Sequence, residues 1–188
     1  MRVAGGFFRF MATTLNATVL FRVAYKHVKG RTIGDTLDAA VWEPKLTIGP
    51  GTGTNQANQQ WYTVGTLAAA ATVDLDLAGV LTNSFGDTVT LTKIRVLAIH
   101  NAGADDGSGG YTTQAGETLK VGAAGTNPIT SIFDGSGTAK IVIHSGGQLL
   151  LTSPADGLTV TAGSADVLRI TNAGTKTIQY RILIQGVE

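Results

Sequence analysis

The last third of the chain constrains its fold most, because short apolar runs alternate there with turn residues and helical spacing is almost absent. The segment 178–185 shows this best. One face of an extended strand would carry Ile178, Tyr180, Ile182 and Ile184. The opposite face would carry Gln179, Arg181 and Gln185. Leu183 alone breaks the alternation, so this segment is predicted to be a strand with one buried face.

Further strands are predicted at short intervals from residue 61 onward, separated by Gly, Asn, Asp and Pro. They are Trp61–Val64, Thr72–Leu77, Thr88–His100, Thr118–Val121, Ala139–His144, Gln148–Leu151, Leu158–Thr161, Val167–Thr171 and Ile178–Gln185. Their number and spacing predict an all-β fold, in which residues 61–188 form an antiparallel β-sandwich of jelly-roll type.

Residues 1–60 have a weaker pattern and are predicted to form an irregular N-terminal arm. A first strand fits between Leu15 and Val28, and one helical turn fits near Asp35–Val41. The Gly, Pro, Asn and Gln residues that follow indicate a loop up to residue 60. A loop of this length is unusual inside a compact domain and tends to be functional or bound to a partner.

The N-terminal ten residues carry a short apolar patch that Arg9 interrupts, which disfavours a signal peptide. Met11 begins a typical polar start, so residues 1–10 are either a native arm or an upstream start. No apolar run approaches the twenty or so residues that a membrane-spanning helix needs. The aromatic residues of the arm are the expected interface anchors, namely Phe7, Phe8, Phe10 and Trp42.

The composition argues against association driven by charge. Only 14% of the residues are charged, and the formal net charge is +1, which gives no long-range field to attract nucleic acid or an anionic membrane. We therefore expect neither as a partner. The chain has no cysteine, so it forms no disulfide, thiolate metal site or thiol nucleophile, and packing, strand pairing or oligomerisation must stabilise it.

No residue set predicts a reaction. His27, His100 and His144 lie far apart in the sequence and lack zinc-ligand spacing. Asp74 and Asp76 share one face of a predicted strand, but the apolar residues between them place the carboxylates on the solvent side. We predict no catalytic residue, no cofactor and no metal requirement, and hence a protein that is not an enzyme.

Three other segments could bind small ligands. Asp105 and Asp106, in NAGADDGSGG, offer oxygen ligands for a cation but lack EF-hand spacing, so a flexible surface loop is favoured. GPGTGTN at residues 49–55 has no lysine after its glycines and is not a phosphate-binding loop. Trp42, Trp61 and Tyr62 could form a sugar-stacking platform, although core or interface positions are favoured.

One internal echo links LAIHNAG at residues 97–103 with LRITNAG at residues 168–174. Each places a strand directly before an Asn-Ala-Gly turn. Because Asn and Gly both tolerate left-handed backbone, such turns recur by chance in β-rich chains, and we favour chance over a true repeat. The equivalent placement also fits two Greek keys folded on one another, as in a jelly roll.

Residues 72–186 contain a recognisable series of motifs. They are a strand that leads to an Asn-containing turn, LKVGAA at Leu119–Ala124, the turn at Pro154–Gly157, and VTAGSAD at Val160–Asp166. In this series the segment resembles a group of small structural proteins of tailed bacteriophages. Residues 1–60 lie outside it and are expected to carry attachment to the particle. Among the roles of such proteins, we favour a cement or decoration protein of the capsid, similar to jelly-roll proteins that bind the outside of a head shell. The absence of predicted enzyme residues, the low charge, the sheet body and the long irregular arm all fit that role.

The expected function is therefore a non-enzymatic virion structural protein that binds and stabilises the outer surface of the head shell. The expected partners are the major capsid protein and further copies of this chain. The alternative is a tail, baseplate or fibre component, with a possible carbohydrate-binding surface. The sequence leaves open the location in head or tail, the oligomer symmetry, the binding face and the host.

Overall fold

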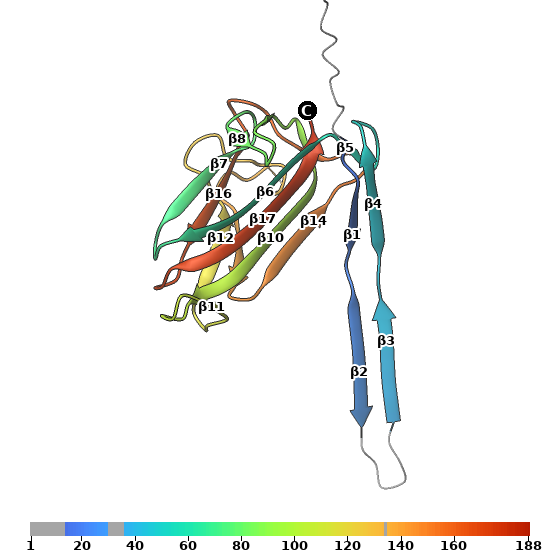
Figure 1. Cartoon of the computed structure of the whole chain (residues 1–188), viewed down its shortest axis with the longest axis vertical. Helices are drawn as coiled ribbons and strands as arrows, with labels where there is room; N and C mark the ends of the chain where they lie inside the picture. Colours follow the sequence, from blue (N-terminus) through green and yellow to red (C-terminus); the bar gives the residue numbers. More distant parts are fainter. Residues whose placement is uncertain (1–13, 30–35, 134) are drawn as a thin grey trace, which may run out of the picture.

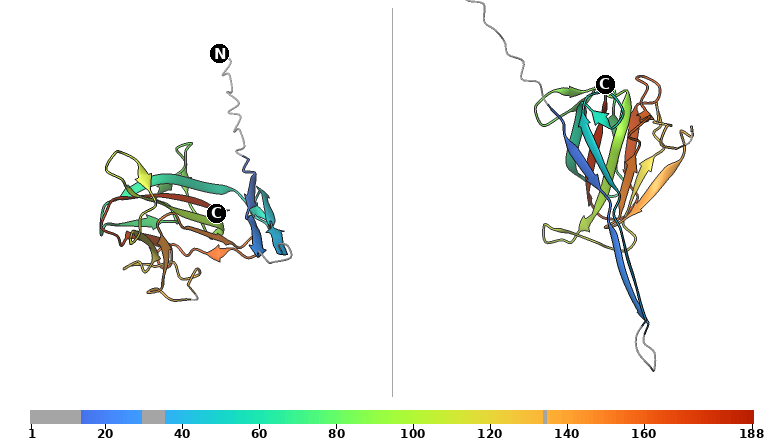
Figure 2. Two further views of the ribbon diagram at one scale, coloured as in Figure 1. Left: turned by 90° about the horizontal axis from the view of Figure 1, so that it is seen from below. Right: turned by 90° about the vertical axis from the view of Figure 1, so that its right-hand side faces the viewer.

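The computed structural model describes residues 14–29, 36–133 and 135–188, and these residues form an all-β protein (Figure 1). Two sheets pack face to face in a sandwich, which we call the body. A long two-stranded ribbon runs beside the body and continues past it (Figures 1 and 2). Within the described ranges, no helix is long and apolar enough to cross a membrane.

One sheet of the body has six strands, all paired antiparallel. Its order runs from β6 (Gln59–Leu67) through β17 (Ile178–Val187) to β10 (Lys93–Asp105). The other edge of β10 pairs with three shorter strands, which are β11 (Tyr111–Thr112), β14 (Gln148–Thr152) and β15 (Leu158–Thr159). The long strand β10 therefore pairs with β17 along one edge and with all three shorter strands along the other.

The second sheet has four antiparallel strands in the order β13, β12, β16 and β7. Their bounds are Lys140–His144, Thr118–Gly122, Val167–Asn172 and Thr72–Asp76. A short antiparallel pair, β8 (Leu81–Thr82) and β9 (Thr88–Val89), lies between β7 and β10 in the sequence.

The eight main strands of the body pair in a nested order. The first strand, β6, pairs with the last, β17, and the second, β7, pairs with the seventh, β16. The third, β10, pairs with the sixth, β14, and the fourth, β12, pairs with the fifth, β13. The outer and third pairs lie in the six-stranded sheet, while the other two pairs lie in the four-stranded sheet.

The core lies between the inner faces of the two sheets. The face predicted for the last strand is confirmed, because Ile178, Tyr180, Ile182 and Ile184 are all buried. Opposite them, the four-stranded sheet contributes a set of buried apolar residues that includes Leu75, Leu119, Val121, Leu168 and Ile170. Each such side chain contributes about 1.5–3 kcal/mol when fully buried, so this layer is the main source of stability.

The N-terminal arm is a β-ribbon. Its strands are β1 (Ala17–Leu20), β2 (Val23–Lys29), β3 (Thr36–Trp42) and β4 (Lys45–Pro50), and β4 also pairs in parallel with the short β5 (Gln56–Ala57). β1 pairs with β4, and β2 pairs with β3, both antiparallel. The strand predicted between Leu15 and Val28 is therefore present as β1 and β2.

All nine strands predicted from residue 61 onward are present, with Thr88–His100 divided into β9 and β10. The helical turn predicted near Asp35–Val41 is wrong, because β3 covers its described part. Ala39 and Ala40 are good helix formers, but pairing with β2 overrides that propensity. The loop predicted up to residue 60 is also wrong in part, since residues 45–50 form β4 and Gln59 begins β6.

Candidate interaction surfaces

The ribbon keeps one register along its whole described length. Ala17 lies opposite Ile48 at one end, and Lys29 lies opposite Thr36 at the other. The strands are interrupted only between these two pairings, where Phe21 donates its amide hydrogen to the carbonyl of Pro44 over 3.3 Å. Pro44 has no amide hydrogen to return, so the ladder is broken there. An ion pair between Arg22 and Glu43, 3.0 Å apart, joins the strands at the break.

A constant register gives the ribbon two faces of fixed composition, because facing residues of an antiparallel pair project to the same side. The first, which we call the near face, carries Ala17, Val19, Phe21, Val23, Tyr25, His27, Asp38, Ala40, Trp42, Pro44, Leu46 and Ile48. The second, the far face, carries Thr18, Leu20, Arg22, Ala24, Lys26, Val28, Leu37, Ala39, Val41, Glu43, Lys45 and Thr47. The near face is the more apolar of the two.

The base of the near face packs against the body. Ile48 and Ala57 are fully buried together with Val96 of β10, and Ala17, Val19 and Leu46 pack around them. Val96 lies on the outer side of the six-stranded sheet, since its neighbour Leu97 points into the core. The ribbon is thus attached to the outer face of this sheet.

Beyond the base, the same near face is uncovered. Phe21, Val23, Tyr25 and Trp42 are all exposed, and Phe21 contacts Trp42 edge to face with ring centroids 5.1 Å apart. Figures 1 and 2 show why, because β2 and β3 extend past the end of the body and lie against no other strand. A series of large apolar side chains on one protruding element is typical of an interaction surface.

The outer face of the six-stranded sheet carries a second apolar surface, which we call the apolar row. It consists of Tyr62, Leu183, Ala98 and Leu150, which lie opposite one another across β6, β17, β10 and β14. Tyr62 and Leu150 are exposed, and the two between them are half-buried. A groove of about 360 Å³ separates this row from Thr18–Leu20 of the ribbon base.

A positive charge lies beside the apolar row. Arg181 and His100 are opposite each other in the next row of the same face. Burial and the nearby Arg181 guanidinium both lower the pKa of His100, with burial the larger cause. The imidazole is therefore mostly neutral at neutral pH, and the guanidinium carries the charge of this row.

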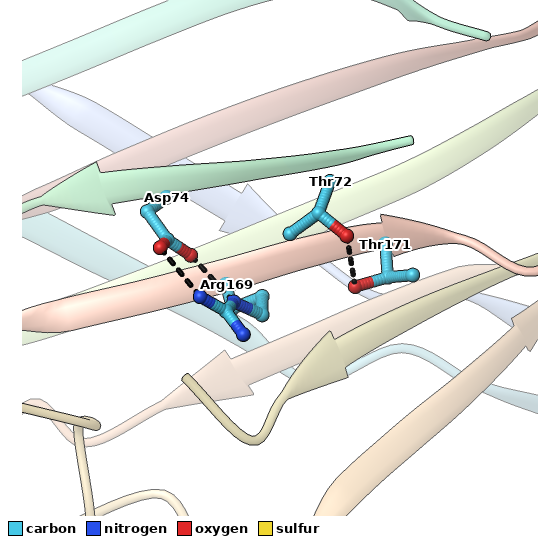
Figure 3. Close-up of polar contacts among 4 residues, drawn as sticks. All are labelled: Thr72, Asp74, Arg169 and Thr171. Atoms are coloured by element: carbon cyan, nitrogen blue, oxygen red, sulfur yellow. Dashed lines mark hydrogen bonds and ion pairs between the residues drawn. The ribbon is translucent and has the colours of Figure 1, made fainter. Parts of the chain in front are cut away.

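On the outer face of the four-stranded sheet, polar side chains of β7 and β16 form hydrogen bonds to one another (Figure 3). Arg169 of β16 donates two hydrogen bonds of 2.7 Å to the Asp74 carboxylate of β7, and the hydroxyls of Thr72 and Thr171 are 3.1 Å apart. The Arg169 side-chain hydrogen bond is the main reason why the pKa of Asp74 lies below its ordinary value. The solvent-side position predicted for Asp74 is confirmed. Its partner Arg169 could not be identified without the pairing register of β7 and β16.

The residues singled out from the sequence are spread over the molecule. Trp42 is on the near face of the ribbon, whereas Phe7, Phe8 and Phe10 lie outside the described residues. Trp61 is buried in the core while Tyr62, on the opposite side of β6, is exposed. The structure therefore does not join the two aromatic residues of β6 into one sugar-stacking platform.

The acidic loop uses its carboxylates internally. Asp105 accepts a hydrogen bond from the amide of Gly107, and Asp106 accepts from the amide and hydroxyl of Ser108, at 2.7–2.8 Å. These bonds form the turn that follows β10. Among the described residues, no three His, Cys, Asp or Glu side chains are close enough to hold a metal ion.

The glycine-rich loop at residues 49–55 serves the body. The carbonyls of Thr52 and Gly53 accept hydrogen bonds from the buried Arg95 guanidinium at 3.4 and 3.2 Å, and Ala155 contributes a third carbonyl. Carbonyl oxygens directed at a cation are the opposite of the amide hydrogens that hold a phosphate. The loop is a structural clamp around Arg95.

The two Asn-Ala-Gly segments each contain the same type of hydrogen bond, from the glycine amide to the asparagine side chain. Asn101 accepts from the amide of Gly103 at 3.2 Å, and Asn172 accepts from the amide of Gly174 at 2.9 Å, and both asparagines are fully buried. Their settings differ, since the first forms a bulge inside β10 and the second ends β16. The sequence similarity of the two segments thus corresponds to the same local hydrogen bond, used once in a bulge and once at a strand end.

Comparisons with known proteins give no identification. No protein-family model, curated protein or solved structure matches the chain.

Proposed function

We propose that the protein is a non-enzymatic structural protein of a tailed-bacteriophage particle, which binds the outside of the head shell as a cement or decoration protein. The assignment to a phage is supported by the sequence resemblance of residues 72–186. The attachment role is supported by one structural observation, the ribbon whose apolar near face continues past the body without cover.

An isolated two-stranded ribbon is marginally stable in water, so a protruding one gains most from protein surfaces that cover it. Both faces of this ribbon offer apolar side chains, because Val41 and Leu37 are exposed on the far face as Trp42 and Val23 are on the near face. A ribbon of this kind suits a position between two protein surfaces.

The charge balance favours the same role. A formal net charge of +1 provides little electrostatic steering, so binding must come from burial of apolar area. On a shell built from many identical subunits, repeated weak contacts add up to durable attachment. The major capsid protein is the proposed partner, and the outer surface of the capsid is the proposed location.

We also propose that the body is of the jelly-roll type. The nested pairing of its eight main strands supports this, because a long hairpin rolled over itself pairs its first strand with its last. The rolled hairpin also divides its pairs alternately between two sheets, as they are divided here.

The test is a variant in which residues 20–45 are replaced by Asn-Gly. Val19 and Leu46 lie opposite each other, so a two-residue turn closes β1 onto β4 and leaves the packing at Val96 intact. Shells assembled from the same phage's major capsid protein are mixed with each protein and sedimented. The intact chain should co-sediment, and the shortened one should bind at least ten times more weakly.

Equal binding of both chains would overturn attachment through the ribbon. Failure of the intact chain to bind shells would overturn the head assignment itself. Binding of the intact chain to tails or to host glycans would instead favour the tail, baseplate or fibre role. Thermal unfolding of both proteins checks that the body of the shortened chain is folded.

A further inference from the structure

We propose that the near face of the ribbon docks on the apolar row of a second copy of this chain, so that copies are joined by ribbon exchange. The docking side chains are Phe21, Val23, Tyr25 and Trp42 of one copy. The receiving side chains are Tyr62, Leu183, Ala98 and Leu150 of the other. This association goes beyond head attachment, because it requires nothing except two copies of the protein.

The first support is continuity with a contact already present in each chain. The base of the near face buries Val96 on the outer side of β10. Two residues further along the same side of β10 is Ala98, in the middle of the apolar row. The near face and this sheet face are therefore matched surfaces, and the chain uses only one end of each.

The second support is that one chain cannot complete this contact with its own ribbon. The unbroken register carries the ribbon on from its base, and β2 and β3 leave the body behind (Figures 1 and 2). At the neck of the ribbon, Phe21 and Trp42 line an open hollow of about 630 Å³ together with Leu150, and all three side chains remain exposed. Val23 and Tyr25, further along the near face, do not line this hollow, so their contact with an apolar row requires another molecule.

The third support is charge. Among the described residues of the near face, Asp38 is the one carboxylate, and it lies two residues along β3 from Ala40. The row next to the apolar row contains Arg181, for which the structure shows no acidic partner among the described residues. A ribbon seated on the apolar row of another copy can bring Asp38 toward Arg181.

Two adjacent residues provide a matched test. Trp42 and Val41 are each 62% exposed, but Trp42 is on the near face and Val41 is on the far face. Sedimentation velocity of the full chain over a range of concentrations measures self-association. Trp42→Glu should weaken it at least tenfold, while Val41→Glu should leave it unchanged. Equal effects of the two substitutions, or an intact chain that stays monomeric, would overturn the proposal.

A mixing experiment tests the partner of the ribbon. Leu150→Glu disables the row but keeps the ribbon, whereas Trp42→Glu keeps the row. Each variant alone should remain mostly monomeric, and an equimolar mixture should associate more strongly than either, because one intact ribbon can still seat on one intact row. If ribbons paired with ribbons, Leu150→Glu alone would associate normally, and the row would be excluded as the docking site.

Charge reversal gives an independent measurement. Asp38→Arg and Arg181→Asp should each weaken association severalfold, and the chain carrying both should recover most of the loss. No recovery in the double variant would show that these two residues do not meet. All of these measurements use the protein alone in solution, so their failure is distinct from a failure to bind head shells.

Discussion

The outer faces of the two sheets differ in their side chains, because one carries polar groups that bind each other and the other carries an exposed apolar row. On the four-stranded sheet, Asp74 and Arg169 bind each other, and Thr72 and Thr171 pair beside them (Figure 3). On the six-stranded sheet, the corresponding middle row is apolar and lies beside the groove at the ribbon base. A polar face that satisfies itself can remain in water, whereas an apolar one gains from being covered.

For the proposed attachment to a head shell, the difference predicts which side of the protein faces the shell. The ribbon leaves the body from the six-stranded side, because its base is fixed at Val96. The uncovered apolar side chains of the ribbon and of the sheet therefore belong to one side of the molecule. The four-stranded sheet is left as the side that we expect to face solvent.

The largest effect on stability is expected from a charge placed on the inner side of a strand, compared with the same charge on its outer side. Ile182→Asp places an unpaired charge in the core that both sheets share and should abolish folding. Gln179→Asp lies on the outer side of the same strand, and we expect it to be tolerated. Circular dichroism and thermal unfolding of the two variants measure this, and equal stability would contradict the assigned strand faces.

A smaller effect is expected on the polar face. An exposed ion pair with two hydrogen bonds contributes about 0.5–1 kcal/mol, so Arg169→Gln should lower the free energy of unfolding by that amount. A double-mutant cycle with Asp74→Asn isolates the coupling. Self-association should not change in either variant, in contrast to Leu150→Glu on the other face.

The same pair predicts a pH dependence. Because Arg169 lowers the pKa of Asp74 in the folded state, the stabilisation is complete above the ordinary carboxyl pKa and is lost as the pH falls through the folded value. Urea unfolding between about pH 5 and pH 2 should therefore show a steeper loss of stability in the intact chain than in Arg169→Gln. Parallel curves would show that the ion pair does not form in solution.

The smallest effect is expected from metal removal. The Asp105 and Asp106 carboxylates accept hydrogen bonds from amides and a hydroxyl of their own loop, just as Asp74 accepts hydrogen bonds from Arg169. Treatment with a chelator should leave the melting temperature unchanged, and added calcium should not raise it. A fall of several degrees after chelation would identify this loop as a cation site.

The sandwich was predictable because burial on one side imposes alternation on a strand. Ile178–Ile184 shows this directly, since every second residue faces the core. β3 has no such pattern, because neither face of the free ribbon is buried and TLDAAVW contains good helix formers. β3 is a strand because it pairs with β2, and the sequence of β3 alone carries no information about that pairing.

The candidate surfaces were less predictable because they depend on register. Tyr62, Ala98, Leu150 and Leu183 are widely separated in the sequence, and only strand pairing aligns them in one row. Leu183 was visible as the residue that broke the alternation of its strand, and its outward position now explains that break. Trp42 was identified from its residue type alone, and the near face to which it belongs required the ribbon register.

The nested pairing of the body has a consequence for synthesis on the ribosome. β17 lies between β6 and β10, so the six-stranded sheet lacks an inner strand until residues 178–187 have emerged. The ribbon pairs neighbouring segments near the N-terminus and can close long before that. Each nascent chain therefore presents its exposed apolar ribbon before the body is complete. On a polysome, where nascent copies lie close together, such a ribbon gives a route to premature aggregation. The proposed docking on the apolar row of completed copies would suppress this aggregation by covering the ribbon.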